Sequence, residues 1–324
     1  MLSKKFTPLS LKNAAKCINN SLRSTYAITG VNLTRGLATN SKVDPKTYAP
    51  KPEFSSIAVR EMLRKSCLHE FTDEEVATRI ELAAAYRLFG LEHWNENILN
   101  HLTAKVEEPD GTASFLINPY GLRYGEITAS SLIKVDEDGN IKHPGVTGDV
   151  FGINRAGYVI HSAIHRARPD VKSIMHNHYP YAAGVSCVKH GFLELAQTSH
   201  QSGPVTYHDY HGIVVDKGEQ KSLAEDIANK DILILRNHGI ITAAESVGAA
   251  YYLMYQFLAA TEIQTHASAN ALGDMNNLFI PNNKLVEKTF DVTREKHFSG
   301  AKYGIKELSA YMRLLDDLDS SYRT

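Results

Sequence analysis

Apolar residues recur at helical spacing in three long segments of the chain. The first segment follows 72–75 (Thr-Asp-Glu-Glu), which has the hydroxyl and acidic residues of a capping box, and it runs to about Gly90. The second covers 156–167 and stops at 168–170 (Arg-Pro-Asp), and the third covers 246–266. Because residues three and four apart share one face of a helix, we predict amphipathic helices in these segments.

Short β-prone runs lie around these helices. The runs 114–118 and 133–135 are each followed by turn-forming residues, and 171–178 reads as a strand. The run 213–215 predicts a further short strand, and 232–235 is apolar on both faces, as in a buried strand. Strands and helices alternate irregularly, which favours a layered α/β domain over repeated βαβ units.

The bulk composition is that of a globular protein. The chain has 324 residues, of which 43% are hydrophobic and 22% charged, and its formal net charge is −1. This charge balance does not favour binding to nucleic acid, and no apolar run reaches the roughly 20 residues of a membrane span. The three cysteines are widely spaced, which predicts neither a disulfide framework nor a cysteine-based zinc site.

The first 43 residues differ in composition from the rest. They contain seven Lys or Arg residues and no Asp or Glu, with many Ser and Thr residues between them. A basic, hydroxyl-rich and acid-free amino terminus is typical of a mitochondrial transit peptide, and 35–38 (Arg-Gly-Leu-Ala) resembles a cleavage site. We therefore predict a location in the mitochondrial matrix. A plastid address and a basic tail without any address are the alternatives.

The remaining chain is predicted to have three parts. Residues 44–70 contain three prolines and are interpreted as a linker or surface arm. The folded domain is placed at 71–270. Residues 271–324 are interpreted as a C-terminal extension packed on that domain.

Three histidines are candidate metal ligands. His176 and His178 are two residues apart in a predicted strand, so they share one face with Cβ atoms about 6.6 Å apart. His238 follows the predicted buried strand 232–235, and Gly239 gives the backbone freedom to turn there. Three neutral imidazoles and an open fourth position are typical of a catalytic Zn²⁺ site, although Fe²⁺ or Mn²⁺ would also suit them. The alternative is hydrogen-bonded or surface histidines without a metal.

Several motifs, in the right order from about Glu75 to the end, resemble the class II aldolase/adducin family. They include the histidine motifs and the loop that contains Tyr207, His208 and Tyr210. The motifs are 118–121 (Asn-Pro-Tyr-Gly), 126–128 (Glu-Ile-Thr), 154–158 (Asn-Arg-Ala-Gly-Tyr), 168–170, 176–178 (His-Asn-His), 207–212 (Tyr-His-Asp-Tyr-His-Gly), 236–239 (Arg-Asn-His-Gly) and 262–264 (Glu-Ile-Gln).

The resemblance implies both a fold and a chemistry. The implied fold is a three-layer α/β/α domain with a central, largely antiparallel sheet. The implied cofactor is Zn²⁺ held by His176, His178 and His238, where it would assist aldol cleavage or decarboxylation of a small hydroxy-carbonyl substrate. The resemblance also implies a homo-oligomer, often a tetramer, with sites at subunit boundaries.

This chain departs from the family's sugar-phosphate aldolases at important positions. Gly157 stands where they carry a catalytic Glu, and a glycine cannot transfer a proton. Their phosphate-binding Gly-Asn falls on Asn100-His101, and in a second phosphate loop Gly121 is retained while Tyr120 replaces a Thr. We predict substrate-binding roles for His101, Tyr120 and Gly121, and we do not expect the usual reaction on a sugar phosphate.

Further residues are catalytic candidates in place of the missing Glu. His161 is four residues before His165 on a predicted helix face directed toward the site, where it could act as a base near the metal. Tyr207, His208 and Tyr210 fall where the family carries a catalytic Tyr contributed by the neighbouring subunit. The alternative for these three is a packed aromatic loop.

Two functions remain open on the sequence. The first is a mitochondrial metal-dependent lyase. The second is a non-catalytic, adducin-like protein of the cytoplasm or cytoskeleton that binds actin or spectrin. The chain ends soon after the acidic stretch 315–319 (Leu-Asp-Asp-Leu-Asp), without the Lys-rich tail of membrane-skeletal adducins, and we expect the first function on this ground.

Overall fold

The computed structural model describes residues 44–209, 212, 217–295 and 300–324. The predicted transit peptide, the predicted strand 213–215 and the candidate Tyr210 lie outside the described residues. The chain divides into the units Met1–Lys46 and Thr47–Thr324, and all the elements below belong to the second unit.

A single eight-stranded sheet forms the centre of this unit. Its strand order is β4-β3-β2-β1-β5-β8-β7-β6, and every neighbouring pair is antiparallel except β6 and β7. β1 and β5 lie side by side in the middle, so the histidines of these two strands are brought together. The strands are β1 (His101–Glu107), β2 (Ala113–Ile117), β3 (Ile133–Val135), β4 (Ile141–His143), β5 (Ser173–Asn177), β6 (Val205–His208), β7 (Ile232–Leu235) and β8 (Gly239–Ala244).

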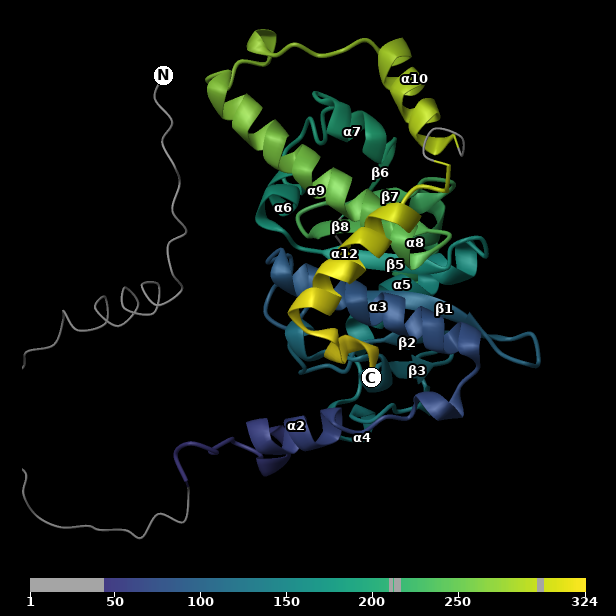
Figure 1. Ribbon diagram of the computed structural model, residues 1–324. Coiled ribbons are helices and arrows are strands. Elements are labelled where there is room, and N and C mark those ends of the chain that lie inside the picture. Colours follow the sequence, from purple (N-terminus) through teal and green to yellow (C-terminus); the bar gives the residue numbers. More distant parts are fainter. Residues whose placement is uncertain (1–43, 210–211, 213–216, 296–299) are drawn as a thin grey trace, which may run out of the picture. The chain divides into compact units, whose positions relative to one another are not determined.

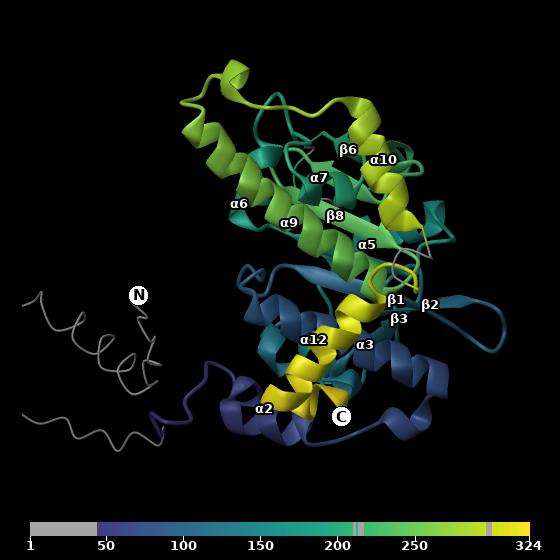
Figure 2. The ribbon, with the colours of Figure 1, turned by 45° about the horizontal axis from the view of Figure 1, so that its top comes forward.

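Helices cover both faces of the sheet. The principal ones are α2 (Ser56–Leu63), α3 (Asp73–Leu91), α5 (Arg155–Ala167), α6 (Pro180–Ser186), α7 (Gln197–Ser202), α8 (Lys217–Ile227), α9 (Val247–Asn270), α10 (Asn283–Arg294) and α12 (Ile305–Leu318). Figure 1 and Figure 2 show α3, α9 and α12 side by side, and these three helices contact one another. None of the helices in the described part of the chain is both long and apolar enough to cross a bilayer.

Successive residues of the central strands face the two helical layers in turn. In β7, Ile232 and Ile234 belong to the core cluster that includes α3 and α9, whereas Leu233 and Leu235 belong to the cluster that includes α5 and α8. This alternation follows from the period of two along a strand. It confirms the predicted three-layer α/β fold with a largely antiparallel sheet.

The three predicted helices are confirmed as α3, α5 and α9. The Thr72 hydroxyl accepts a hydrogen bond from the Glu75 amide at 3.2 Å, as the capping pattern predicts, although α3 continues one residue past Gly90. β7 has the predicted bounds. The predicted strand 171–178 is too long, because β5 ends at Asn177 and His178 lies just beyond it.

The C-terminal residues also pack on the sheet domain. Leu308 and Leu315 of α12 are buried in the same cluster as α3 and α9. At the end of the chain, the Thr324 carbonyl accepts a hydrogen bond from the Ser130 amide at 2.8 Å, and Asp319 forms an ion pair with Arg87 at 3.2 Å. These contacts complete the helical layer over α3.

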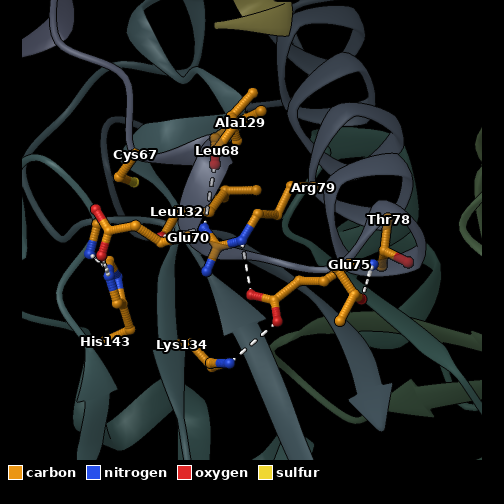
Figure 3. A network of polar contacts seen from close by, with 12 residues as sticks. Cys67, Leu68, Glu70, Glu75, Thr78, Arg79, Ala129, Leu132, Lys134 and His143 are labelled. Atoms are coloured by element: carbon orange, nitrogen blue, oxygen red, sulfur yellow. Dashed lines mark hydrogen bonds and ion pairs between the residues drawn. The ribbon is translucent and has the colours of Figure 1, made fainter. Parts of the chain in front are cut away.

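A buried arginine ties α3 to the loops on the β2–β3 side of the sheet. Arg79 has no exposed surface, and its Nε donates to the Glu75 carboxylate at 2.9 Å (Figure 3). Its Nη1 donates to the carbonyls of Ala129 and Leu132 at 3.2 and 2.8 Å. The guanidinium also lies 3.8 Å from the centre of the Phe71 ring, so one side chain joins three segments of the chain.

Replacing this arginine with an apolar residue of similar length should destabilise the fold. Arg79→Met would leave two buried carbonyls without their donor, so we expect the free energy of unfolding to fall by about 1–3 kcal/mol. The measurement is urea unfolding followed by circular dichroism. Arg64→Ala, at an exposed arginine beyond α2, is the matched control and should change stability by less than about 0.5 kcal/mol. Equal effects of the two substitutions would contradict this role.

Candidate metal centre

Three histidines converge at one end of the central strands. The ligand atoms of His176, His178 and His238 all lie within 4.8 Å of one another. The distances between their ring centres are 4.5, 4.7 and 4.8 Å, so the rings form a nearly regular triangle. The structure therefore brings together the three residues that the sequence identifies as candidate ligands.

Hydrogen bonds to other groups determine which ring nitrogen of His176 and of His178 is free to bind a metal. The Nδ1–H of His176 donates to the Ile240 carbonyl at 2.9 Å, and a carbonyl can only accept. The Nδ1 of His178 is 2.6 Å from a carboxylate oxygen of Glu96, which also acts as an acceptor. When such a ring is neutral, its lone pair is therefore on Nε2.

These two Nε2 atoms face each other at 2.7 Å. Burial lowers the pKa of His176 well below its usual value, and the neighbouring histidines lower it further, so this ring stays neutral. Two facing lone pairs repel unless a cation is shared between them. The donor set therefore fits a divalent metal with imidazole ligands, and the Glu96–His178 contact is a typical support for such a ligand.

His238 reaches the other two rings from the turn between β7 and β8. Asn237 in this turn has a left-handed φ of 55°, which Asn tolerates better than most residues. A Cβ on Gly239 would lie 2.3 Å from the Asn177 carbonyl oxygen and 2.9 Å from the His178 ring. Only glycine allows the turn to approach β5 this closely, and this approach places His238 beside His178.

Sequence reasoning missed Glu96, which precedes its partner His178 by 82 residues. Asn100 organises the loop that carries Glu96, because its side-chain oxygen accepts from the Glu96 amide at 2.7 Å. Nothing in the local pattern distinguishes Glu96 from a surface carboxylate. Only the folding of the loop between α3 and β1 over the end of β5 reveals its role.

A pocket of about 430 Å³ opens over the three histidines. A pocket of this volume can hold a small-molecule ligand. His101 is the one predicted substrate-binding residue in its lining, and Gly212 is the one residue of the 207–212 motif found there among the described residues. The lining residues are Glu96, Leu99, His101, Asn154, Ala156, Gly157, Ile160, His176, His178, Ala183, Gly212, Asn237 and His238.

Two catalytic candidates lie on β6 and do not line this pocket. The Tyr207 hydroxyl accepts from the Phe192 amide at 3.0 Å, and the Arg236 guanidinium stacks over its ring at 4.0 Å. His208 is buried, with its Nδ1 2.7 Å from the Asp226 carboxylate. Both residues have well-defined packing partners within this chain, and their catalytic roles stay predictions.

The other candidates also lie outside the pocket lining. Tyr120 is exposed, and its amide donates to the Gly152 carbonyl at 2.9 Å. Gly121 has a φ of 130° and packs against the Phe151 ring. Their predicted substrate-binding roles stay predictions.

His161 is fully buried behind His101 and does not line the pocket. Its Nε2 lies 2.9 Å from His101 Nδ1, so His101 is the member of this pair that faces the pocket. Burial lowers the pKa of His101 to about 3, and burial together with the neighbouring His101 and His165 lowers the pKa of His161 well below its usual value. Both rings are neutral at physiological pH.

These observations define a class of protein. It is an α/β domain with three histidines gathered at one end of its central strands. The domain described as Class II Aldolase and Adducin N-terminal domain matches residues 80–265. The chain belongs to the class II aldolase and adducin family.

Similar proteins include both an adducin and an aldolase II superfamily protein. Alpha-adducin of Rattus norvegicus is 41% identical over 268 residues, which cover 81% of this chain and 36% of the adducin. This chain thus spans about a third of the length of that relative. The structure of an aldolase II superfamily protein from Pseudomonas syringae is 37% identical, with a TM-score of 0.71 and coverage of 79% of this chain and 98% of the other.

A solved sugar-phosphate aldolase is also similar. L-fuculose 1-phosphate aldolase from Glaciozyma antarctica is 26% identical, with a TM-score of 0.65 and coverage of 78% of this chain and 93% of that one. The family therefore includes proteins named as aldolases and proteins named as adducins, and membership alone is compatible with either function.

Removing the carboxylate behind His178 should weaken metal binding. Glu96→Gln keeps the size of the side chain but removes the charge that orients the imidazole, so we expect zinc affinity to fall about 10- to 100-fold. Competition with a chromophoric chelator measures the dissociation constant. Glu92→Gln, at an exposed residue before the same loop, is the control. An unchanged affinity in Glu96→Gln would exclude this supporting role.

Proposed function

We propose that this chain binds one divalent metal ion, Zn²⁺ in the first instance and Fe²⁺ or Mn²⁺ as alternatives, through His176, His178 and His238. The observation that carries the proposal is the 2.7 Å approach of the Nε2 atoms of His176 and His178, whose Nδ1 atoms already face acceptors, with His238 beside them. Three neutral imidazoles leave a coordination position open to a ligand, as in catalytic rather than structural sites.

We further propose that the protein is a lyase that breaks a carbon–carbon bond in a small hydroxy-carbonyl compound. A metal in this position would polarise the substrate carbonyl. His101 supplies a neutral polar group at the pocket wall, and the apolar Leu99 and Ile160 limit the size of the substrate that the pocket can hold. No Lys or Arg is among the described lining residues, which supports a substrate without a phosphate group at this position.

A substrate screen on the metal-loaded protein tests the proposed reaction. Small hydroxy-ketones, hydroxy-aldehydes and hydroxy-acids would be incubated with the full chain, and the release of aldehyde or carbon dioxide would be followed. We expect cleavage of at least one compound, its loss in His238→Ala, and its loss and recovery on removal and return of metal. Turnover that survives in His238→Ala would contradict the proposed centre.

A non-catalytic, adducin-like role is the second candidate. It is favoured by the 41% identity to alpha-adducin and by Gly157, which cannot act as an acid or base. On this alternative the chain would bind actin or spectrin, and sedimentation with filaments would detect it. Filament binding at micromolar affinity together with no turnover in the screen would favour this candidate.

We also propose that the protein acts in the mitochondrial matrix as a homo-oligomer, with a tetramer as the expected form. The acid-free, basic first 43 residues support this location. Sequencing the amino terminus of the protein from its source cells should give a start near Ala38. An intact Met1 on cytosolic protein would overturn the mitochondrial location.

A further inference from the structure

A row of three residues on α5, two of them histidines, packs against two polar residues of β1 beside the candidate metal centre. Gly157, His161 and His165 are spaced four apart, so they lie along one face of the helix. His101 and Thr103 are two apart and share one face of the strand. The two rows pack together in a buried position, and His101 and Gly157 also line the pocket.

Hydrogen bonds link the side chains of these residues into a continuous network. His101 Nδ1 lies 2.9 Å from His161 Nε2, and His161 Nδ1 lies 2.7 Å from the Thr103 hydroxyl. The same hydroxyl lies 3.0 Å from His165 Nε2. This network fixes the orientation of the His101 ring, because rotating the ring would break its hydrogen bond to His161.

The His101 ring fills the space that a side chain at position 157 would occupy. A Cβ built on Gly157 would lie 2.1 Å from His101 Nε2 and 2.3 Å from Cδ2. These distances are far below van der Waals contact, so no residue other than glycine fits while the ring stays in place. The identities of residues 101 and 157 are therefore coupled.

The Nε2 edge of this ring lies against Gly157, at the wall of the pocket. Both His101 and Gly157 line it, and within the described part of the chain His101 is hydrogen-bonded through Nδ1 alone. Its ring centre is 5.0 Å from that of His176, so the ring lies beside the candidate metal centre. A hydroxyl group both donates and accepts, and it can pair with Nε2 in either tautomer.

We propose that His101 Nε2 binds the hydroxyl group of a hydroxy-carbonyl ligand, and that Gly157 is required to admit the His101 ring to this position. The inference rests on the proposed metal centre, which would bind the oxygens of the same ligand. His101 thus determines specificity from the sheet, at the place where helix α5 carries no side chain.

Glycolate and acetate are suitable probes, because they share a carboxylate and differ in the neighbouring hydroxyl. Their binding to the zinc-loaded full chain would be measured by calorimetry, with metal content determined for every variant. In His101→Ala we expect the dissociation constant of glycolate to rise roughly 3- to 10-fold, the magnitude of one hydrogen bond, with acetate binding and metal content unchanged.

Gly157→Ala tests the same contact from the other side, because the added methyl group would push the ring out of place. We expect it to weaken glycolate binding as His101→Ala does. Gly184→Ala is the matched control, since this exposed helical glycine has no atom within 4 Å of an added Cβ. The double variant of His101→Ala and Gly157→Ala removes the clash, so it should fold even if Gly157→Ala does not.

The outcomes separate this inference from the proposed function. A folded wild type that binds no zinc would overturn the metal centre itself. Wild type that binds zinc but does not distinguish glycolate from acetate would overturn the His101 contact. So would variants at residues 101 and 157 that retain wild-type glycolate affinity.

Discussion

Metal-free protein should gain about 4 kcal/mol in its free energy of unfolding when free zinc is raised to 1,000 times the dissociation constant. The gain follows from linkage, because three histidines that are gathered in the folded chain are dispersed in the unfolded one. Only the folded state then offers a high-affinity site. Urea unfolding in zinc buffers of known free concentration measures the shift.

Variants of the ligands should abolish this gain. The double variant of His176→Ala and His238→Ala removes two of the three imidazoles, so its unfolding curve should not respond to zinc over the same range. His190→Ala, at an exposed histidine outside the cluster, should behave as wild type. An equal response of the double variant and wild type would show that the stabilising metal binds elsewhere.

The second large effect is a loss of stability in acid. Burial lowers the pKa of both His101 and His165 to about 3, against about 6.5 in an unfolded chain. Above pH 6.5 both states carry neutral rings and the full stability is present. Below pH 6.5 the unfolded state binds protons that the folded state does not, so stability falls as the pH falls.

Each of these two buried rings costs about 1.4 kcal/mol per pH unit, so the two together contribute a loss of about 5 kcal/mol between pH 6.5 and pH 4.5. His161, His176 and His238, whose pKa values are also lowered, add to this loss in metal-free protein. Urea unfolding of metal-free protein across this range measures the loss. His165→Asn should reduce the slope by about 1.4 kcal/mol per pH unit, whereas His69→Asn, at an exposed position, should not. A His165→Asn slope identical to that of wild type would contradict the assignment.

The clustering of the three candidate metal ligands could be predicted from the sequence, because their signals are local or resemble motifs of the family. His176 and His178 are close in the chain, and His238 directly follows an apolar run. The fold class follows from the motifs that resemble the family and from the helical periodicity of α3, α5 and α9. The predicted bounds of β5 are less accurate, because the strand ends at Asn177 and His178 reaches the site from just beyond it.

The supporting residues could not be predicted, because their roles depend on contacts between distant segments. Glu96 has no distinguishing neighbours in the sequence, and its contact with His178 exists only once its loop folds over β5. The face of β1 that carries His101 and Thr103 is polar yet buried, so its pattern resembles that of a surface strand. The coupling of His101 to Gly157 depends on how closely α5 approaches β1 in the folded chain.

The metal content of the purified full chain tests the central claim most directly. Elemental analysis of wild-type protein prepared without chelators should find about one divalent metal ion per chain. The double variant of His176→Ala and His238→Ala should contain none. A fully folded wild type without metal, which also fails to take up zinc, iron or manganese on dialysis, would contradict the account.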